Sequence, residues 1–222
     1  MYWKYHKSVS NKRQRVANDD SDEGSESSDN TSIKLPFLFQ KSSNSYLTTN
    51  FNHIYFNNDI TNDSAFELNK ELRSVDTKIK TLSASLGVEK QPIYLHLTTD
   101  GGLIYSAFSV IDCIKSLSVP VYTVIDGFVA SAGTLIVLAG KKRFMCENAY
   151  MLIHELRGGI WGKMTEIEEE YINLKKIMKH LINIYVENTN LTKSELKEIL
   201  KKDLIWNINE CITNGLIHEQ YK

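Results

Sequence analysis

The sequence has few cysteines and no long hydrophobic run, and each of these absences excludes a class of protein. Three cysteines in 222 residues are odd in number and far apart, so they do not form a disulfide framework. Cys113, Cys146 and Cys211 stand in apolar stretches, and we interpret them as buried free thiols of a reducing compartment. The longest apolar run, around Thr134 to Gly140, is much shorter than the ~18 to 20 residues of a membrane span.

The chain also lacks a strong net charge, and we expect no targeting segment. Its 26 Lys and Arg residues and 27 Asp and Glu residues give a net charge of −1, whereas nucleic-acid binding needs a concentrated positive surface. The N-terminus has no apolar stretch of the secretory type, and the acidic tract Asp19 to Asp29 is unlike an organellar targeting peptide. We expect a cytoplasmic protein that binds neither nucleic acid nor membrane, with an organellar or nuclear location left open.

Residues 1–34 differ in composition from the rest of the chain. A basic cluster at Lys12, Arg13 and Arg15 precedes the acidic, serine-rich tract. Such a segment buries too little apolar surface to offset the entropy of ordering, so we expect a disordered leader. It is either a nuclear-import or phosphorylation tail or simply a solvated leader. Residues 35–222 are long enough for one domain with a real core.

Hydrophobic periodicity predicts strands that alternate with helices over this domain. Strands are expected near residues 51–56, 93–97, 119–125, 143–146 and 149–153. Helices are expected from residue 61 or 62, over 107–117, 131–139 and 164–187, and from residues 192 and 207. Alternation of this kind requires crossover connections, so the fold class is α/β with a mostly parallel sheet. The helix over 164–187 is unusually long, and we expect it to project and pack against another subunit.

A serine lies in a run of small residues between a predicted strand and a predicted buried helix. In Gly127-Phe-Val-Ala-Ser131-Ala-Gly133 the small neighbours allow a sharp turn, and the helix N-terminus favours a developing anion. The simpler interpretation is a turn or a helix cap. His154 ends the strand before it, where sites collect in open α/β sheets, although a partly buried structural histidine is the alternative.

The glycine pair Gly101-Gly102 closes another strand and allows close approach of the backbone to a ligand. The N–H of Gly102 and that of Ala132 are candidate oxyanion donors, while a tight turn before a helix is the alternative. The sequence lacks the motifs of nucleotide, dinucleotide and metal binding. There is no Walker loop and no dinucleotide glycine fingerprint, and the six histidines do not pair with cysteines at metal spacing. We therefore expect no metal and no cofactor.

Taken together, the motifs from about residue 51 to 219 resemble ClpP, the proteolytic subunit of ATP-dependent Clp proteases. The order and spacing of six stretches match, at Ile93–Gly102, Gly127–Gly133, Ala139–Phe144, Met151–His154, Gly158–Gly162 and Glu210–Leu216. The resemblance implies the ClpP/crotonase-like fold, with a mostly parallel sheet, repeated β-β-α units and a protruding long helix for ring stacking. It also implies a strand at Gly158–Lys163.

The resemblance assigns a serine peptidase site. It implies Ser131 as the nucleophile, His154 as the base, Asp203 as the residue that orients the base, and the Gly102 and Ala132 amides as the oxyanion hole. Substrate is held as an added strand between two backbone segments. The residues implied in this binding are Gly101, Leu103, Ile104, Leu156, Arg157, Gly158 and Gly159.

The partners that the resemblance implies are copies of the chain itself and a separate ATPase. We expect a homo-oligomeric ring, two stacked heptamers, and unfolded polypeptide delivered by an AAA+ unfoldase. The sequence has no nucleotide-binding motif, so ATP would act only through that partner.

Several positions depart from the family pattern. Asp100 stands before the glycine pair where the family has proline, and Glu155 follows the base where the family has glutamine. An arginine usually neighbours the triad aspartate, but here Lys201 and Lys202 precede Asp203 and Leu204 follows it. Two alternatives therefore remain. The chain is either a catalytically weak or inactive ring subunit of the same fold, or a crotonase-like acyl-thioester enzyme with Glu155 or Asp100 as its base.

Overall fold

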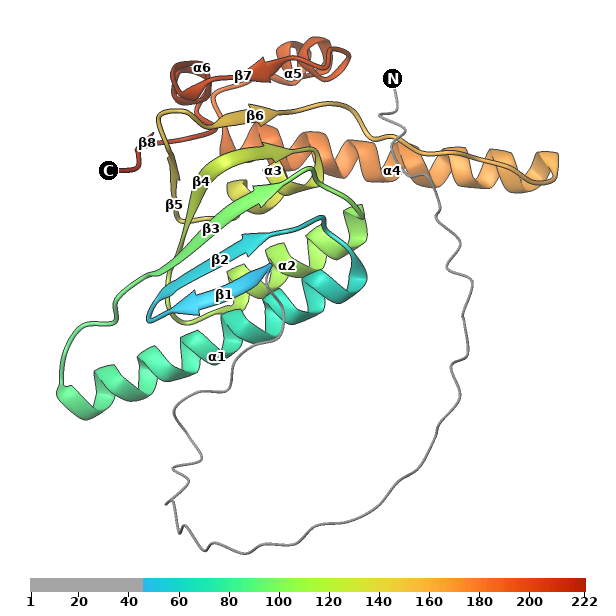
Figure 1. The fold of residues 1–222 in the computed structure, drawn as a ribbon. Helices are drawn as coiled ribbons and strands as arrows, with labels where there is room; N and C mark the ends of the chain where they lie inside the picture. Colours follow the sequence, from blue (N-terminus) through green and yellow to red (C-terminus); the bar gives the residue numbers. More distant parts are fainter. Residues whose placement is uncertain (1–45) are drawn as a thin grey trace, which may run out of the picture. The chain divides into compact units, whose positions relative to one another are not determined.

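The computed structural model describes residues 46–222 (Figure 1). The expected leader over residues 1–34 lies outside the described residues, as do residues 35–45. The elements follow one another as β1 Leu47–Asn50, β2 His53–Asn57, α1 Asn62–Leu86, β3 Ile93–Thr99, α2 Ile104–Ser116, β4 Val121–Ala130, α3 Ala132–Leu138, β5 Lys142–Met145, β6 Tyr150–Leu152, α4 Met164–Asn188, α5 Lys193–Leu200, β7 Ile205–Trp206, α6 Ile208–Thr213 and β8 Glu219–Gln220.

The strands form one mixed sheet in which parallel pairing dominates. The strand order is β1-β2-β3-β4-β5-β8, and β6 pairs with β4 while β7 pairs with β6. Only β1–β2 and β6–β7 are antiparallel among the described pairs. The predicted α/β class with a mostly parallel sheet is confirmed.

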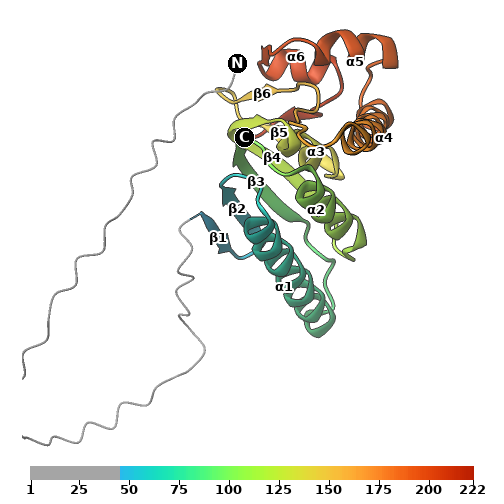
Figure 2. The same cartoon turned by 90° about the vertical axis from the view of Figure 1, so that its right-hand side faces the viewer.

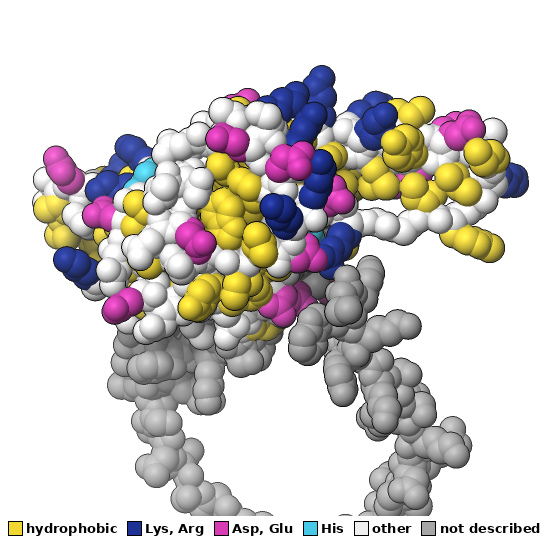
Figure 3. All heavy atoms as spheres, turned by 90° about the horizontal axis from the view of Figure 1, so that it is seen from above, with side chains coloured by type: hydrophobic (Ala, Val, Ile, Leu, Met, Phe, Trp, Pro, Cys, Tyr) yellow, Lys and Arg dark blue, Asp and Glu magenta, His cyan; other side chains and the backbone are white. Residues whose placement is uncertain are grey.

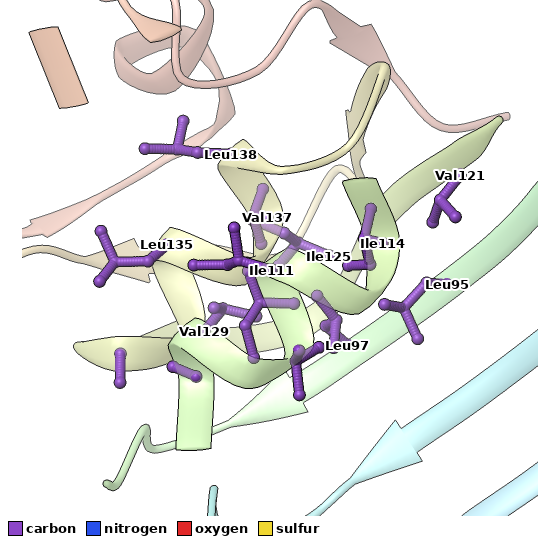
Figure 4. Close-up of a cluster of buried hydrophobic side chains, with 14 of the residues drawn as sticks. Leu95, Leu97, Ile111, Ile114, Val121, Ile125, Val129, Leu135, Val137 and Leu138 are labelled. Carbon is purple, nitrogen blue, oxygen red and sulfur yellow. The ribbon is translucent and has the colours of Figure 1, made fainter. Parts of the chain in front are cut away.

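Helices cover one face of this sheet. Figure 2 shows α1, α2 and α3 along the same side of the strands, and each packs against the next in the chain, with α3 also packing against α4. All seven residues of α3 are buried, as the sequence predicted for this apolar segment. Between helices and sheet lies a core of aliphatic side chains, where each buried leucine or isoleucine contributes about 1.5–3 kcal/mol. Figure 4 shows part of it, including Leu95, Leu97, Ile111, Ile125 and Leu135.

The predicted starts of α1, α5 and α6 are confirmed by their caps. The Thr61 side chain accepts a hydrogen bond from the Ser64 amide at 3.1 Å at the start of α1. Thr192 caps α5 and Asn207 caps α6 in the same way, each with a glutamate three residues on that completes a capping box. These side chains satisfy amides that the first helical turn leaves without an acceptor.

The long helix α4 projects from the rest of the domain (Figure 1). Its buried residues, Leu181, Ile182, Ile184 and Tyr185, all lie near its C-terminal end. Apolar side chains remain exposed along its other part and in the segment that leads to it (Figure 3), among them Trp161, Met164, Tyr171 and Ile172. Contrary to the resemblance, residues 158–163 form no strand, because no segment of the described chain pairs with them.

The cysteines confirm the prediction only in part. All three are free, and Cys113 and Cys211 are buried, but Cys146 at the end of β5 is only half-buried. Burial raises the pKa of the Cys211 thiol to about 12. Across residues 46–222, no helix has the length and apolar character needed to cross a bilayer.

Candidate active site

Ser131 lies at a sharp turn between β4 and α3. The sequence predicted a strand that ends near residue 125, but β4 continues to Ala130, because it pairs first with β5 and then with β6. Ser131 has φ 55° and ψ −126°, a conformation that residues other than glycine rarely adopt and that costs about 1–3 kcal/mol. Its N–H donates to the Leu152 carbonyl at 3.0 Å, which anchors the turn to β6.

Gly101, the first residue of the glycine pair, packs directly against this turn. Gly101 has φ 97°, and a methyl group there would lie 2.6 Å from Cβ of Ser131 and 2.8 Å from the Ala130 carbonyl oxygen. The pair is held by Ile60, whose N–H donates to the Gly101 carbonyl and whose carbonyl accepts from the Leu103 N–H, both at 2.7 Å. Only glycine fits this approach, so the turn requires the residue that the sequence places there.

The sheet register brings the other two expected triad residues to the same edge. In the parallel pair β4–β6, Ala130 is opposite Leu152, and His154 follows two residues later. In the antiparallel pair β6–β7, Leu152 is opposite Ile205, so continuing that register by two residues sets Asp203 opposite His154. Ser131, His154 and Asp203 therefore follow or precede three adjacent strands at one end of the sheet.

Two of these three side chains, those of His154 and Asp203, are engaged with other partners. Nδ1 of His154 lies 2.6 Å from the Glu155 carbonyl oxygen. That oxygen can only accept, so Nδ1 is the donor, and in the neutral imidazole Nε2 then keeps its lone pair. Asp203 forms an ion pair with Arg157, and the two side chains are 51% and 42% exposed. Within the described residues, no hydrogen bond joins Ser131 to His154 or His154 to Asp203.

The two segments expected to bind substrate differ in how free their backbones are. Leu103 is exposed but its N–H is already bonded to Ile60, and Ile104 begins α2. Residues 156–159 form neither helix nor strand and lie at the surface. The second segment therefore offers the more accessible backbone for pairing with an added strand.

Three contacts at the site were not predicted. Arg157 was expected in substrate binding, yet here it pairs with Asp203. Thr134 Oγ1 donates to the Ser131 carbonyl at 2.6 Å and contacts the hydroxyl of Tyr185 from α4. The sequence did hold a signal for the Thr134 contacts. Thr134 is a polar residue in an otherwise apolar, fully buried helix, and buried hydroxyl groups need hydrogen-bond partners.

A strained serine turn beside glycine backbone, at the end of a mostly parallel sheet, is compatible with a serine hydrolase that uses backbone amides as oxyanion donors. A family model described as Clp protease matches residues 49–221, and the chain belongs to the Clp protease family. It is accordingly a peptidase, a hydrolase of peptide bonds. Among the described residues, no group of three or more His, Cys, Asp or Glu side chains is arranged to hold a metal ion.

Individual relatives agree with this assignment. The chain is 35% identical over 155 residues to ATP-dependent Clp protease proteolytic subunit 2 of Treponema denticola, which covers 69% of this chain and 77% of that protein. It is 30% identical over 168 residues to proteolytic subunit 1 of Chlamydia muridarum, covering 74% and 83%. A solved ClpP1 mutant from Listeria monocytogenes superposes with a TM-score of 0.64 at 24% identity, over 75% of this chain and 88% of that chain, which shows the shared fold.

Proposed function

We propose that the chain is a serine endopeptidase subunit that hydrolyses unfolded polypeptide with Ser131, His154 and Asp203. The observation that carries this proposal is the register of β4, β6 and β7, which brings the three residues to one edge of the sheet. The close approach of Gly101 to the Ser131 turn adds a second support, since backbone amides of these two turns would be suited to bind an oxyanion.

The proposed reaction follows the scheme of serine peptidases. His154 Nε2 takes the proton of Ser131 Oγ, and the oxygen attacks the peptide carbonyl to give a tetrahedral oxyanion. The amides of Gly102 and Ala132 stabilise that oxyanion. His154 then protonates the leaving amine, and water hydrolyses the acyl-enzyme with His154 again as the base. The Nδ1–H tautomer inferred from the Glu155 contact leaves Nε2 free for this role.

Asp203 and His154 Nδ1 would both have to exchange partners for the full triad to form. Its present ion pair with Arg157 is half-exposed, and pairs of this kind contribute about 0–1 kcal/mol. Arg157 belongs to the segment proposed to pair with substrate, so ordering of that segment as a strand would move the arginine. Breaking the ion pair with Arg157 therefore requires little free energy, and the new bond to Asp203 would replace the one that His154 Nδ1 makes to the Glu155 carbonyl.

We further propose that the chain acts within a homo-oligomeric ring, of two stacked heptamers, in the cytoplasm. The relatives are named as proteolytic subunits of an ATP-dependent protease, which supports an AAA+ unfoldase as a separate partner. The exposed apolar side chains of α4 and Trp161 support packing against another copy, because a water-exposed indole and its neighbours gain from burial. No cofactor is needed for the proposed chemistry.

A second candidate is an inactive ring subunit. It is favoured by one observation, that Asp203 pairs with Arg157 while His154 Nδ1 bonds to the Glu155 carbonyl. Membership of the Clp protease family favours peptide hydrolysis over the acyl-thioester chemistry that Asp100 or Glu155 would serve.

The two candidates are separated by measuring hydrolysis of a fluorogenic peptide and of an unfolded polypeptide by the full chain. Replacement Ser131→Ala should lower turnover by about 10³-fold or more, because triad residues act as a unit. Ser85→Ala, on the exposed surface of α1, is the matched control and should match the unmodified protein. A folded, assembled protein that cleaves neither substrate would support the inactive subunit.

A further inference from the structure

A buried chain of hydroxyl groups connects α4 to the peptide group that follows the serine. Tyr185 of α4 is 1% exposed and its hydroxyl contacts Thr134 Oγ1 of α3, which is also fully buried. Thr134 in turn donates to the Ser131 carbonyl oxygen twice, through Oγ1 at 2.6 Å and through its N–H at 3.0 Å.

The direction of these hydrogen bonds is fixed by chemistry. A carbonyl oxygen only accepts, so the Thr134 hydroxyl donates its proton to the Ser131 carbonyl oxygen. The Tyr185 hydroxyl must therefore donate to Thr134 Oγ1. Burial raises the pKa of Tyr185, so the phenol keeps its proton near neutral pH. The hydrogen bonds therefore all point in one direction, from the Tyr185 hydroxyl to Thr134 Oγ1 and from Thr134 to the Ser131 carbonyl oxygen.

The carbonyl that receives these bonds belongs to the same peptide group as the Ala132 N–H. Donors on the oxygen of an amide draw electron density from its nitrogen, and successive hydrogen bonds strengthen one another in a low-dielectric interior. The two hydrogen bonds to the Ser131 carbonyl also fix the orientation of the peptide group between Ser131 and Ala132. Ser131 itself has a strained backbone conformation. Ala132 is the first residue of α3, where a helix provides no acceptor for the N–H.

We propose that Tyr185 and Thr134 are positioning residues that orient and polarise the 131–132 peptide group, so that the Ala132 N–H is preorganised to bind the oxyanion. This inference rests on the proposed function. It differs from a purely structural role, in which the Tyr185 hydroxyl only satisfies Thr134 inside the core. The two roles predict different kinetics.

The test compares Tyr185→Phe, Thr134→Val and Thr134→Ser with the unmodified full chain in peptide hydrolysis. Loss of an entire oxyanion donor costs about 10²–10³-fold in kcat, so weakening one should cost less. We expect kcat to fall about 3–10-fold in Tyr185→Phe and about 10–100-fold in Thr134→Val, with KM within about twofold. Thr134→Ser retains the hydroxyl and should restore most of the activity.

A second measurement isolates the oxyanion. A peptide boronic acid forms a tetrahedral anionic adduct with the serine oxygen, so its inhibition constant should weaken in parallel with kcat/KM. Tyr122→Phe, on a strand of the sheet, is the matched tyrosine control and should change neither quantity. All assays are run well below each variant's melting temperature. If Thr134→Val fails to fold, Tyr185→Phe carries the test, because it removes one oxygen atom only.

The outcomes are distinct. Unchanged kcat and unchanged boronate inhibition in a folded Tyr185→Phe and Thr134→Val, even with lowered melting temperatures, would overturn the inference and leave a structural role. A rise in KM alone would also overturn it. If the unmodified, assembled protein neither cleaves peptide nor binds the boronic acid, the proposed function itself is wrong and this inference is wrong with it.

Discussion

Replacing Gly101 by alanine perturbs the contact between the glycine turn and the serine turn at its closest point. The new methyl group would lie 2.6 Å from Ser131 Cβ and 2.8 Å from the Ala130 carbonyl oxygen, at a φ of 97°. The positive φ costs about 1–2 kcal/mol in a residue with a side chain. Overpacking typically adds about 1–3 kcal/mol. We therefore expect Gly101→Ala to lower the free energy of unfolding by about 2–5 kcal/mol.

Two other glycines separate the causes of this loss. Gly87 has φ 65°, but a methyl group there would meet open space, so Gly87→Ala measures backbone strain alone. Gly127 has an ordinary φ, and its methyl would lie 3.5 Å from Thr98, so Gly127→Ala should change stability little. Urea unfolding gives the three free energies, and peptide hydrolysis by the folded fraction shows whether activity falls further. Equal losses for Gly101→Ala and Gly87→Ala, with activity retained, would refute the close packing at Ser131.

Three further predictions concern stability and accessibility. Asp76 is buried and accepts the amides of the turn before β4, at 3.0 and 2.8 Å, so Asp76→Ala should lower the free energy of unfolding by about 3 kcal/mol in urea titrations. Burial lowers the pKa of His53, and the neighbouring charge of His96 lowers it further. Burial also lowers the pKa of His218, and the neighbouring charge of Arg143 lowers it further. Both imidazoles are therefore favoured in the neutral form in the folded chain. The stability they contribute is present above pH 6.5 and is lost as the pH falls through their folded values; His218→Gln should flatten this dependence, and an unchanged slope would contradict it. Iodoacetamide should modify the half-buried Cys146 before Cys211, as mass spectrometry of the native protein would show.

Most of the fold could be predicted from the sequence, because long elements carry a strong periodic signal. The apolar face of α1 and its cap at Thr61 were both evident, as was the fully apolar segment that forms α3. The short strands β1, β7 and β8 could not be predicted, since two to four residues show no reliable alternation. Their existence depends on partners distant in the sequence.

The positions of the candidate site residues followed from motifs, but their contacts did not. Small residues around Ser131 predicted a sharp turn, and the structure has one with positive φ. The sequence contained no indication that Arg157 would pair with Asp203, because they are 46 positions apart and both lie in irregular segments. The extension of β4 to Ala130 was also missed, since a strand that changes partner midway has no distinct local pattern.

The most direct measurement of the central claim is labelling of the assembled protein with a fluorophosphonate probe, followed by mapping of the modified residue. If Ser131 is an activated nucleophile, the probe should label Ser131 in the unmodified chain, and Ser131→Ala should abolish the labelling. His154→Ala should slow labelling strongly, since the base is lost. Labelling at a different residue, or none in a folded and assembled sample, would contradict the account.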